Sequence, residues 1–167
     1  RLLRRVKELG GMVSGHAENP DVIGLRAGQG LKEGKSWPWY HYMSRPEFVE
    51  AEADKRTVHW ATHLDAPVYL VHMADKEGLE ACIRAKNDNF EVYVETCPQY
   101  LEFTCDVYKR EDGRNFVCSP PMKGEESRQA LWTDLQAGYH DSVATDPCHF
   151  QGSAQAWGQA GYTTLPN

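Results

Sequence analysis

The stretch that decides the fold is APVYLVHMADKEGLEACIRAKNDNFEVYVETC, residues 66–97. A proline-led apolar run of strand length at 66–75 is followed by a helical pattern at 76–87 and by a second strand-like run at 90–97. A strand, a helix and another strand in this order predict a βαβ unit, in which both strands lie parallel in one sheet.

The same alternation continues on both sides of this unit. Upstream, leucine and valine at helical spacing end at Gly10, and residues 11–19 (GMVSGHAEN) predict a strand. A polar loop is expected to about residue 39, and the S-x-x-E pattern of Ser44 and Glu47 predicts a capped helix to about Asp65. Downstream, residues 101–116 look like a loop, 116–121 extended, and 125–138 helical before the apolar run at 142–146. Strands and helices that take turns predict an α/β fold with a parallel sheet, open or closed into a barrel.

Composition limits the classes of protein. With 167 residues, 41% hydrophobic and 25% charged, the chain has the makeup of one soluble globular domain. A net charge of −6 without a basic block argues against nucleic acid or an anionic membrane as partner, and no apolar run reaches the roughly 20 residues of a membrane span. Five cysteines without C-x-x-C pairing favour reduced thiols and a cytoplasmic location. Because the chain begins at Arg1 inside a predicted helix, we expect a fragment.

Three polar residues each follow a predicted strand: His16, His72 and Asp146. The carboxyl ends of parallel strands lie on one face of the sheet, where ligands and catalytic groups gather, so these side chains should converge. Either histidine alone would more often be a hydrogen-bonded structural residue. Two imidazoles with a carboxylate, however, are what zinc takes in catalytic sites, which favours a metal centre.

Two other patterns have ordinary interpretations. His59 and His63 have the i, i+4 spacing of a helical metal pair, but their helix lies between strands, so we expect a surface pair on its outer face. Trp37 and Trp39 could line a substrate mouth or hold a loop in place, and the sequence favours neither.

A family resemblance rests on several distinctive strings taken together. In order and spacing, the chain resembles the dihydropyrimidinase/D-hydantoinase family of cyclic amidohydrolases over nearly its whole length. The strings that carry this resemblance are HAENPDVI, HYMSRPEFVEAEA, VYLVHMAD, VETCPQYL, CSPPM, SVATD and the final LPN.

The resemblance implies a fold and a chemistry. The fold would be the C-terminal part of a (β/α)8 TIM barrel, from about strand 5 to the loop after strand 8, with residues 1–167 as a partial catalytic barrel. The full-length enzyme would hold two zinc ions, bridged by a lysine carboxylated on its side chain and by hydroxide, and would assemble as a homotetramer. It would open dihydropyrimidine or hydantoin rings to N-carbamoyl amino acids in the cytoplasm.

The resemblance also implies roles for single residues. His16 and His72 would hold the second metal, and Asp146 would bind the first metal and carry the proton. Main-chain groups at Ser119 and Asn167 would bind the amide edge of the substrate ring. The family's H-x-H pair, bridging lysine, substrate-binding tyrosine and any accessory β-sandwich domain would lie outside this chain.

Departures from the family pattern keep alternatives open. The chain reads TDPCHF where the family usually reads TDHCPF, so Pro147 directly follows the proposed base and fixes its own φ there. Pro20 and Ala156 also replace residues common in the family. A noncatalytic relative that keeps the barrel as a scaffold is one alternative, although such relatives tend to lose the later histidine and the aspartate. A related ring-opening enzyme such as allantoinase or dihydroorotase is the other.

Overall fold

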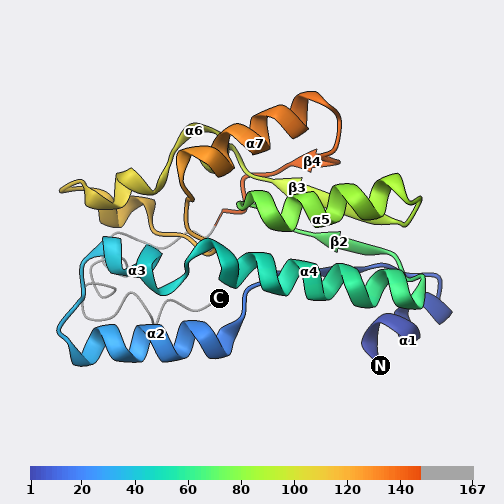
Figure 1. Ribbon diagram of the computed structural model, residues 1–167, viewed down its shortest axis with the longest axis horizontal. Helices are drawn as coiled ribbons and strands as arrows, with labels where there is room; N and C mark the ends of the chain where they lie inside the picture. The colour runs from blue at the N-terminus through green and yellow to red at the C-terminus, as the bar shows by residue number, and fades with distance from the viewer. Residues whose placement is uncertain (148–167) are drawn as a thin grey trace.

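The computed structural model describes residues 1–147, which form a parallel sheet connected by helices (Figure 1). Its strands are β1 (Val13–Gly15), β2 (Val68–Leu70), β3 (Val92–Thr96) and β4 (Ser142–Val143), in the spatial order β1-β2-β3-β4. Val68 pairs with Val13 on one side and with Val92 on the other, and Thr96 pairs with Val143. The predicted parallel α/β arrangement is therefore confirmed.

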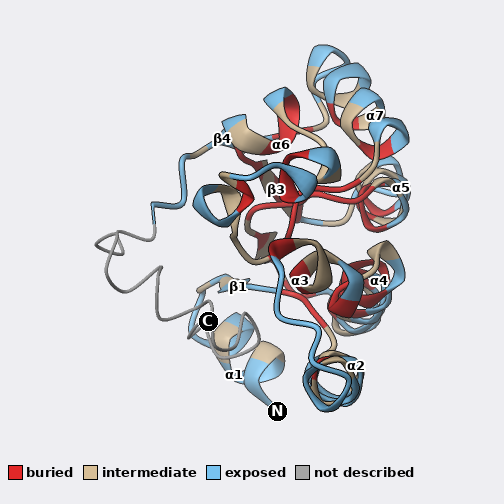
Figure 2. Ribbon diagram, turned by 90° about the vertical axis from the view of Figure 1, so that its left-hand side faces the viewer, coloured by how far each residue is buried: buried red, intermediate tan, exposed pale blue. Residues whose placement is uncertain are grey.

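Helices lie before β1 and in each connection between strands. They are α1 (Leu2–Glu8), α2 (Pro20–Lys32), α3 (Pro38–Ser44), α4 (Glu47–Leu64), α5 (Lys76–Asn87), α6 (Pro98–Glu102) and α7 (Glu125–Gln136), with 3-10 turns at Cys105–Lys109 and Gly113–Phe116. Figure 2 shows α4, α5 and α7 together on one side of the strands. This leaves the opposite face of the sheet for other contacts.

The core lies between the sheet and these three helices. Along β2 and β3 the buried positions alternate with half-buried ones, so Val68, Leu70, Val92 and Val94 face the helices. Leu79 of α5 packs in the same cluster and is fully buried. The strands thereby hold a fixed register at the edge where the candidate site lies.

Local sequence signals explain several helix ends. Gly10 has φ +70° just after α1, a conformation that costs glycine little. Asp65 ends α4 in the left-handed region, and the Asp75 side chain caps α5 by accepting a hydrogen bond from the Gly78 amide. The bounds of α5 agree with the helix predicted at 76–87.

Three local predictions were wrong. Residues 20–32 form α2 rather than a polar loop, because the Asn19 side chain accepts from the amides of Asp21 and Val22 and Pro20 opens the helix. The expected capping box at Ser44 does not form, since Ser44 ends α3 and donates to the His41 carbonyl. Likewise, α6 and the two 3-10 turns replace much of the loop expected at 101–116.

No helix in the described part of the chain is long and apolar enough to cross a membrane.

Candidate functional site

The three predicted metal ligands lie at the carboxyl ends of strands of the one parallel sheet. His16 directly follows β1, His72 follows β2 and Asp146 follows β4. Gly15 is paired with Leu70, and Thr96 with Val143, so these strand ends meet at the same edge of the sheet. The structure brings His16 and His72 into contact at this edge, and Asp146 follows a strand that ends at the same edge.

The two histidines are in direct contact. His16 Nδ1 lies 2.9 Å from His72 Nε2, and the rings are 4.7 Å apart at an interplanar angle of 69°. Only one proton fits between two nitrogens at this distance, so at least one of them presents a lone pair to the other. Both nitrogens lie near enough to serve one metal ion, since zinc binds imidazole nitrogen at about 2.0–2.1 Å.

Glu18 sets the proton position of His16. Its Oε2 lies 3.2 Å from His16 Nε2, and its side chain is 2% exposed. Burial raises the pKa of Glu18, but the hydrogen bond with His16 and the charges of Lys123 and Arg45 outweigh it, so this pKa is lowered. The Glu18 carboxylate beside Nε2 favours a proton on that nitrogen, so that the His16 Nδ1 lone pair can face His72.

His72 is buried and has an unusual backbone. Its φ is +45°, which a residue with a side chain adopts only at a cost, and its amide donates to Glu95 Oε1 at 3.4 Å. Burial and the neighbouring His16 lower its pKa, against an opposite effect of Asp146. A neutral imidazole in this position is a competent metal ligand.

Asp146 is exposed and near enough for its charge to raise the pKa of His72. Its φ is +41°, and the preceding Thr145 carbonyl accepts a hydrogen bond from Gln99 Nε2 at 3.5 Å. Pro147 is the last described residue, and the chain at 146–147 has no regular secondary structure. An exposed carboxylate beside the histidine pair has the freedom that a proton acceptor needs.

Ser119 lies in a loop that is held on both sides. The Cys118 carbonyl accepts from His41 Nε2 at 2.8 Å, and the Pro120 carbonyl accepts from the Tyr100 hydroxyl at 2.8 Å. Ser119 itself is half-buried. These contacts fix the main chain that was predicted to bind substrate, whereas Asn167 and the altered His149 and Ala156 lie outside the described residues.

The residues present fit a zinc ion. Two imidazole nitrogens face each other, a buried carboxylate lies beside one ring, and the carboxylate of Asp146 is near enough to act on the pKa of the other. Among the described side chains, His72 Nδ1 is buried without a hydrogen-bond partner. His16 also lines a hollow of about 1030 Å³, so a solute can reach this side of the pair.

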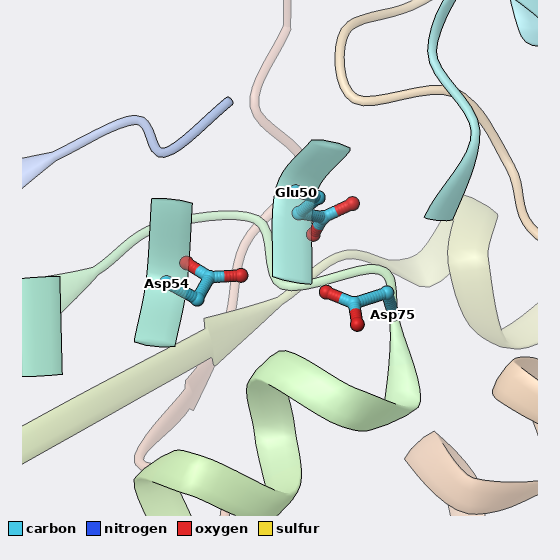
Figure 3. Close-up of side chains that lie close together, drawn as sticks. All are labelled: Glu50, Asp54 and Asp75. Carbon is cyan, nitrogen blue, oxygen red and sulfur yellow. The ribbon is translucent and has the colours of Figure 1, made fainter. Parts of the chain in front are cut away.

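Sequence reasoning missed a buried acidic cluster beside this site. Figure 3 shows the side chains of Glu50 and Asp54, from successive turns of α4, pointing towards that of Asp75 at the start of α5. One carboxylate oxygen of each lies within 4.8 Å of the others, and Lys123 Nζ lies 2.9 Å from Glu50 Oε2. We call Glu50, Asp54, Asp75 and Lys123 the acidic cluster.

The acidic cluster is strongly desolvated. Burial raises the pKa of Glu50 to about 8 and also raises those of Asp54 and Asp75. Burial lowers the pKa of Lys123, but the carboxylates around it, Glu50 foremost, outweigh this and raise it. The i, i+4 spacing of Glu50 and Asp54 was a visible signal, but nothing in the sequence indicated that Lys123 would be their partner.

A second missed group lies on the face of the sheet away from α4 and α5. The Tyr69 hydroxyl donates to Glu95 Oε2 at 2.7 Å and lies 2.5 Å from Ser142 Oγ, which links β2, β3 and β4. Glu95 also accepts a hydrogen bond from the His72 amide, so this group helps to hold the His72 main chain in place. The alternating pattern of the strands was the signal that these side chains share a face.

The remaining candidates are not part of the histidine pair, although His63 lines the same hollow as His16. His59 and His63 stack at 6.5 Å on the exposed side of α4, in agreement with the surface interpretation. Trp39 packs on Tyr42 and lies under Lys109 Nζ, 4.4 Å from its ring centre, which favours a role in holding this loop. Trp37 is 48% exposed.

Comparison with known proteins finds similar sequences that are much longer than this chain. No family model matches the chain. It is 35% identical over 170 residues to a D-hydantoinase of Streptomyces coelicolor and 36% identical over 167 residues to a D-phenylhydantoinase of Escherichia coli. These alignments cover 100% and 99% of this chain, yet the chain spans only 36% of the length of either relative.

Solved structures agree with the sequence comparison. A dihydropyrimidinase from Brevibacillus agri superimposes with a TM-score of 0.94 at 36% identity, and a D-hydantoinase from Thermus sp. with 0.93 at 33%. Each match covers 99% of this chain and 37% of the other. The predicted fold class, part of an amidohydrolase TIM barrel, is confirmed. In sequence and in fold, this chain is thus similar to the dihydropyrimidinases and D-hydantoinases, and it corresponds to about 36% of the length of the two relatives named above.

Proposed function

We propose that the protein containing this chain is a zinc-dependent cyclic amidohydrolase. Its reaction would be the hydrolytic opening of a 5,6-dihydropyrimidine or hydantoin ring to an N-carbamoyl amino acid. The observation that carries the proposal is the contact of His16 Nδ1 with His72 Nε2, with Glu18 fixing the proton on the far side of His16. The names of the similar proteins point to the same reaction class.

His16 and His72 would hold the metal through these two nitrogens. Zinc, when bound, supplies a Lewis acid that polarises a carbonyl and lowers the pKa of water to about 7. Asp146 would accept the proton of the attacking water and deliver it to the departing ring nitrogen, so one carboxylate serves as base and then as acid. Main-chain groups at Ser119, together with Asn167, would hold the amide edge of the ring.

Several parts of this proposal come from the family resemblance alone. They are a second zinc bridged by a carboxylated lysine outside this chain, a homotetrameric assembly and a cytoplasmic location. Dihydrouracil, dihydrothymine and substituted hydantoins share the same amide edge, so the contacts proposed for Ser119 and Asn167 do not choose between them.

The alternatives make different demands on the site. A noncatalytic scaffold has no need for two histidines in contact with their tautomers fixed, and the joint presence of His16, His72 and Asp146 favours an enzyme. An allantoinase or a dihydroorotase would use the same metal ligands and would differ only in the ring that it opens.

The test is ring opening of dihydrouracil and hydantoin by the zinc-loaded, full-length protein. Asp146→Ala should abolish most of the activity, whereas the matched change Asp88→Ala, at the exposed end of α5, should leave it intact. No turnover of either ring by folded, zinc-loaded wild-type protein would contradict the proposal. Turnover of a different cyclic amide would move the assignment to a related enzyme.

A further inference from the structure

A row of buried polar side chains connects His16 to the loop that contains Ser119. Its members are Glu18, which is 8% exposed, Arg45, which is 3% exposed, and His41, which is fully buried. They come from two separate segments, the turn after β1 and the end of α3. Buried polar groups that span segments in this way constrain how those segments can move relative to each other.

The contacts run in one order. Glu18 Oε2 lies 3.2 Å from His16 Nε2 and 3.7 Å from Arg45 Nε. Arg45 Nη1 in turn lies 3.3 Å from His41 Nδ1, and His41 Nε2 lies 2.8 Å from the Cys118 carbonyl. The row therefore begins at a proposed metal ligand and ends at the peptide before Ser119.

Chemistry fixes every proton along this row. A guanidinium has donors only, so His41 Nδ1 must accept from Arg45, and its Nε2 must then carry the proton donated to Cys118. At the other end, the Glu18 carboxylate lies 3.2 Å from His16 Nε2 and favours a proton on that nitrogen. Arg45 thus balances the charge of Glu18 on one side and sets the tautomer of His41 on the other.

We propose that Glu18, Arg45 and His41 are positioning residues that couple the orientation of His16 to the position of the Cys118–Ser119 main chain. This inference rests on the proposed function, because it assigns His16 to the metal and the Ser119 main chain to the substrate. Its distinctive consequence is that a substitution at either end of the row should change both zinc affinity and the KM for substrate. A ring-opening enzyme needs this coupling because the carbonyl must lie at a fixed distance from the metal while the amide edge is held.

The first test changes His41 in the full-length protein. His41→Phe keeps the shape but removes the donor and the acceptor, and we expect about a tenfold rise in KM for dihydrouracil and about a tenfold loss of zinc affinity, measured by chelator competition. His41→Gln should restore most of both, because its amide can donate to Cys118 and accept from Arg45. The control His59→Phe, on the exposed side of α4, should change neither.

The second test starts from the other end of the row. Glu18→Gln keeps an acceptor for His16 but removes the charge opposite Arg45, so it remains informative even where His41→Phe fails to fold. We expect weaker zinc binding and also a higher KM, although Glu18 does not touch Cys118.

Two results would overturn the inference, and they differ. If His41→Phe changes only KM and Glu18→Gln changes only zinc affinity, the contacts are independent and there is no coupling, while the proposed function stands. If the wild-type protein binds no zinc and opens no ring, the inference falls together with the proposed function.

Discussion

The histidine pair and the acidic cluster share one short segment, from His72 to Asp75, yet they differ in exposure to solvent and in whether their polar groups already have a charged partner. The pair has partly exposed His16 and two nitrogens that face each other with a lone pair to spare. The cluster is sealed, with Glu50, Asp75 and Lys123 at most 3% exposed and the ammonium already beside a carboxylate. An accessible pair of nitrogens with a lone pair is suited to binding an ion. A buried cluster that already contains a cation is suited to a structural role.

The acidic cluster also connects the loops on which the site depends. Glu50 Oε1 accepts from the Ala74 amide at 2.7 Å, just after His72, and Lys123 lies on the chain that follows Ser119. Its structural role and the proposed binding role of the pair can therefore be separated by substitution, and the predictions below do so in order of effect.

The largest effect is expected from the histidine pair. His72→Ala should lower ring-opening activity of the full-length protein by more than about 100-fold, beyond the range of residues that only support a metal ligand. Its free energy of unfolding without metal should change far less than that of a variant of the acidic cluster. Steady-state kinetics and urea unfolding of the same preparation measure both quantities. A His72→Ala variant that is strongly destabilised but keeps normal activity would contradict the prediction.

A large loss of stability is expected from Lys123→Met. The change leaves Glu50, Asp54 and Asp75 without their buried cation, and removing one partner of a buried pair typically costs about 3–5 kcal/mol. Urea unfolding of the full-length protein measures this. A cost below 1 kcal/mol would show that the carboxylates do not depend on the ammonium.

A smaller loss is expected from Gly78→Ala. A Cβ at this position would lie 2.5 Å from Asp54 Oδ2 and 2.8 Å from Asp75 Oδ2, so overpacking should cost about 1–3 kcal/mol. The control is Gly28→Ala in α2, where a Cβ meets nothing within 4 Å and better helix propensity should stabilise by about 0.5–1 kcal/mol. Equal effects of the two changes would show that the cluster tolerates expansion.

The smallest effect at neutral pH is expected from Asp54→Asn. Because burial raises the pKa of Glu50 from 4.5 to about 8 and also raises that of Asp54, the folded state binds more protons than the unfolded state. This contribution to stability is complete below the unfolded pKa and is lost as pH rises through the folded pKa.

The amide in Asp54→Asn imitates the protonated acid and cannot ionise. The variant should therefore match the wild type below about pH 4 and lose less stability than the wild type as the pH rises from about 4 to 8. Unfolding midpoints measured across this range test it, and parallel pH profiles for both proteins would contradict it.

Much of the fold could be predicted from short-range patterns. The apolar runs at β2 and β3 and the helical pattern of α5 are local, and their order alone gave parallel strands. The prediction failed where a single cap decided the outcome, as at Asn19, whose side chain starts α2 despite three glycines in that helix. It failed again at Ser44, which is the last residue of α3, whereas Pro46 is the residue at the N-cap of α4.

The candidate site could be predicted only in part. Strand order indicated that His16 and His72 converge, because the ends of parallel strands share an edge. It could not show that Lys123 lies beside Glu50, or that His41 reaches the Cys118 carbonyl, because such contacts depend on how long loops pack. Charged residues in these loops look the same in sequence whether they are exposed or buried.

The most direct test of the account is the zinc content of the full-length protein after dialysis, compared among the wild type, His16→Ala with His72→Ala, and Asp54→Asn. We predict that the histidine double variant loses metal that the wild type retains, and that Asp54→Asn retains all of it. Loss of metal from Asp54→Asn with full retention in the histidine variant would place the ion in the acidic cluster and contradict the account.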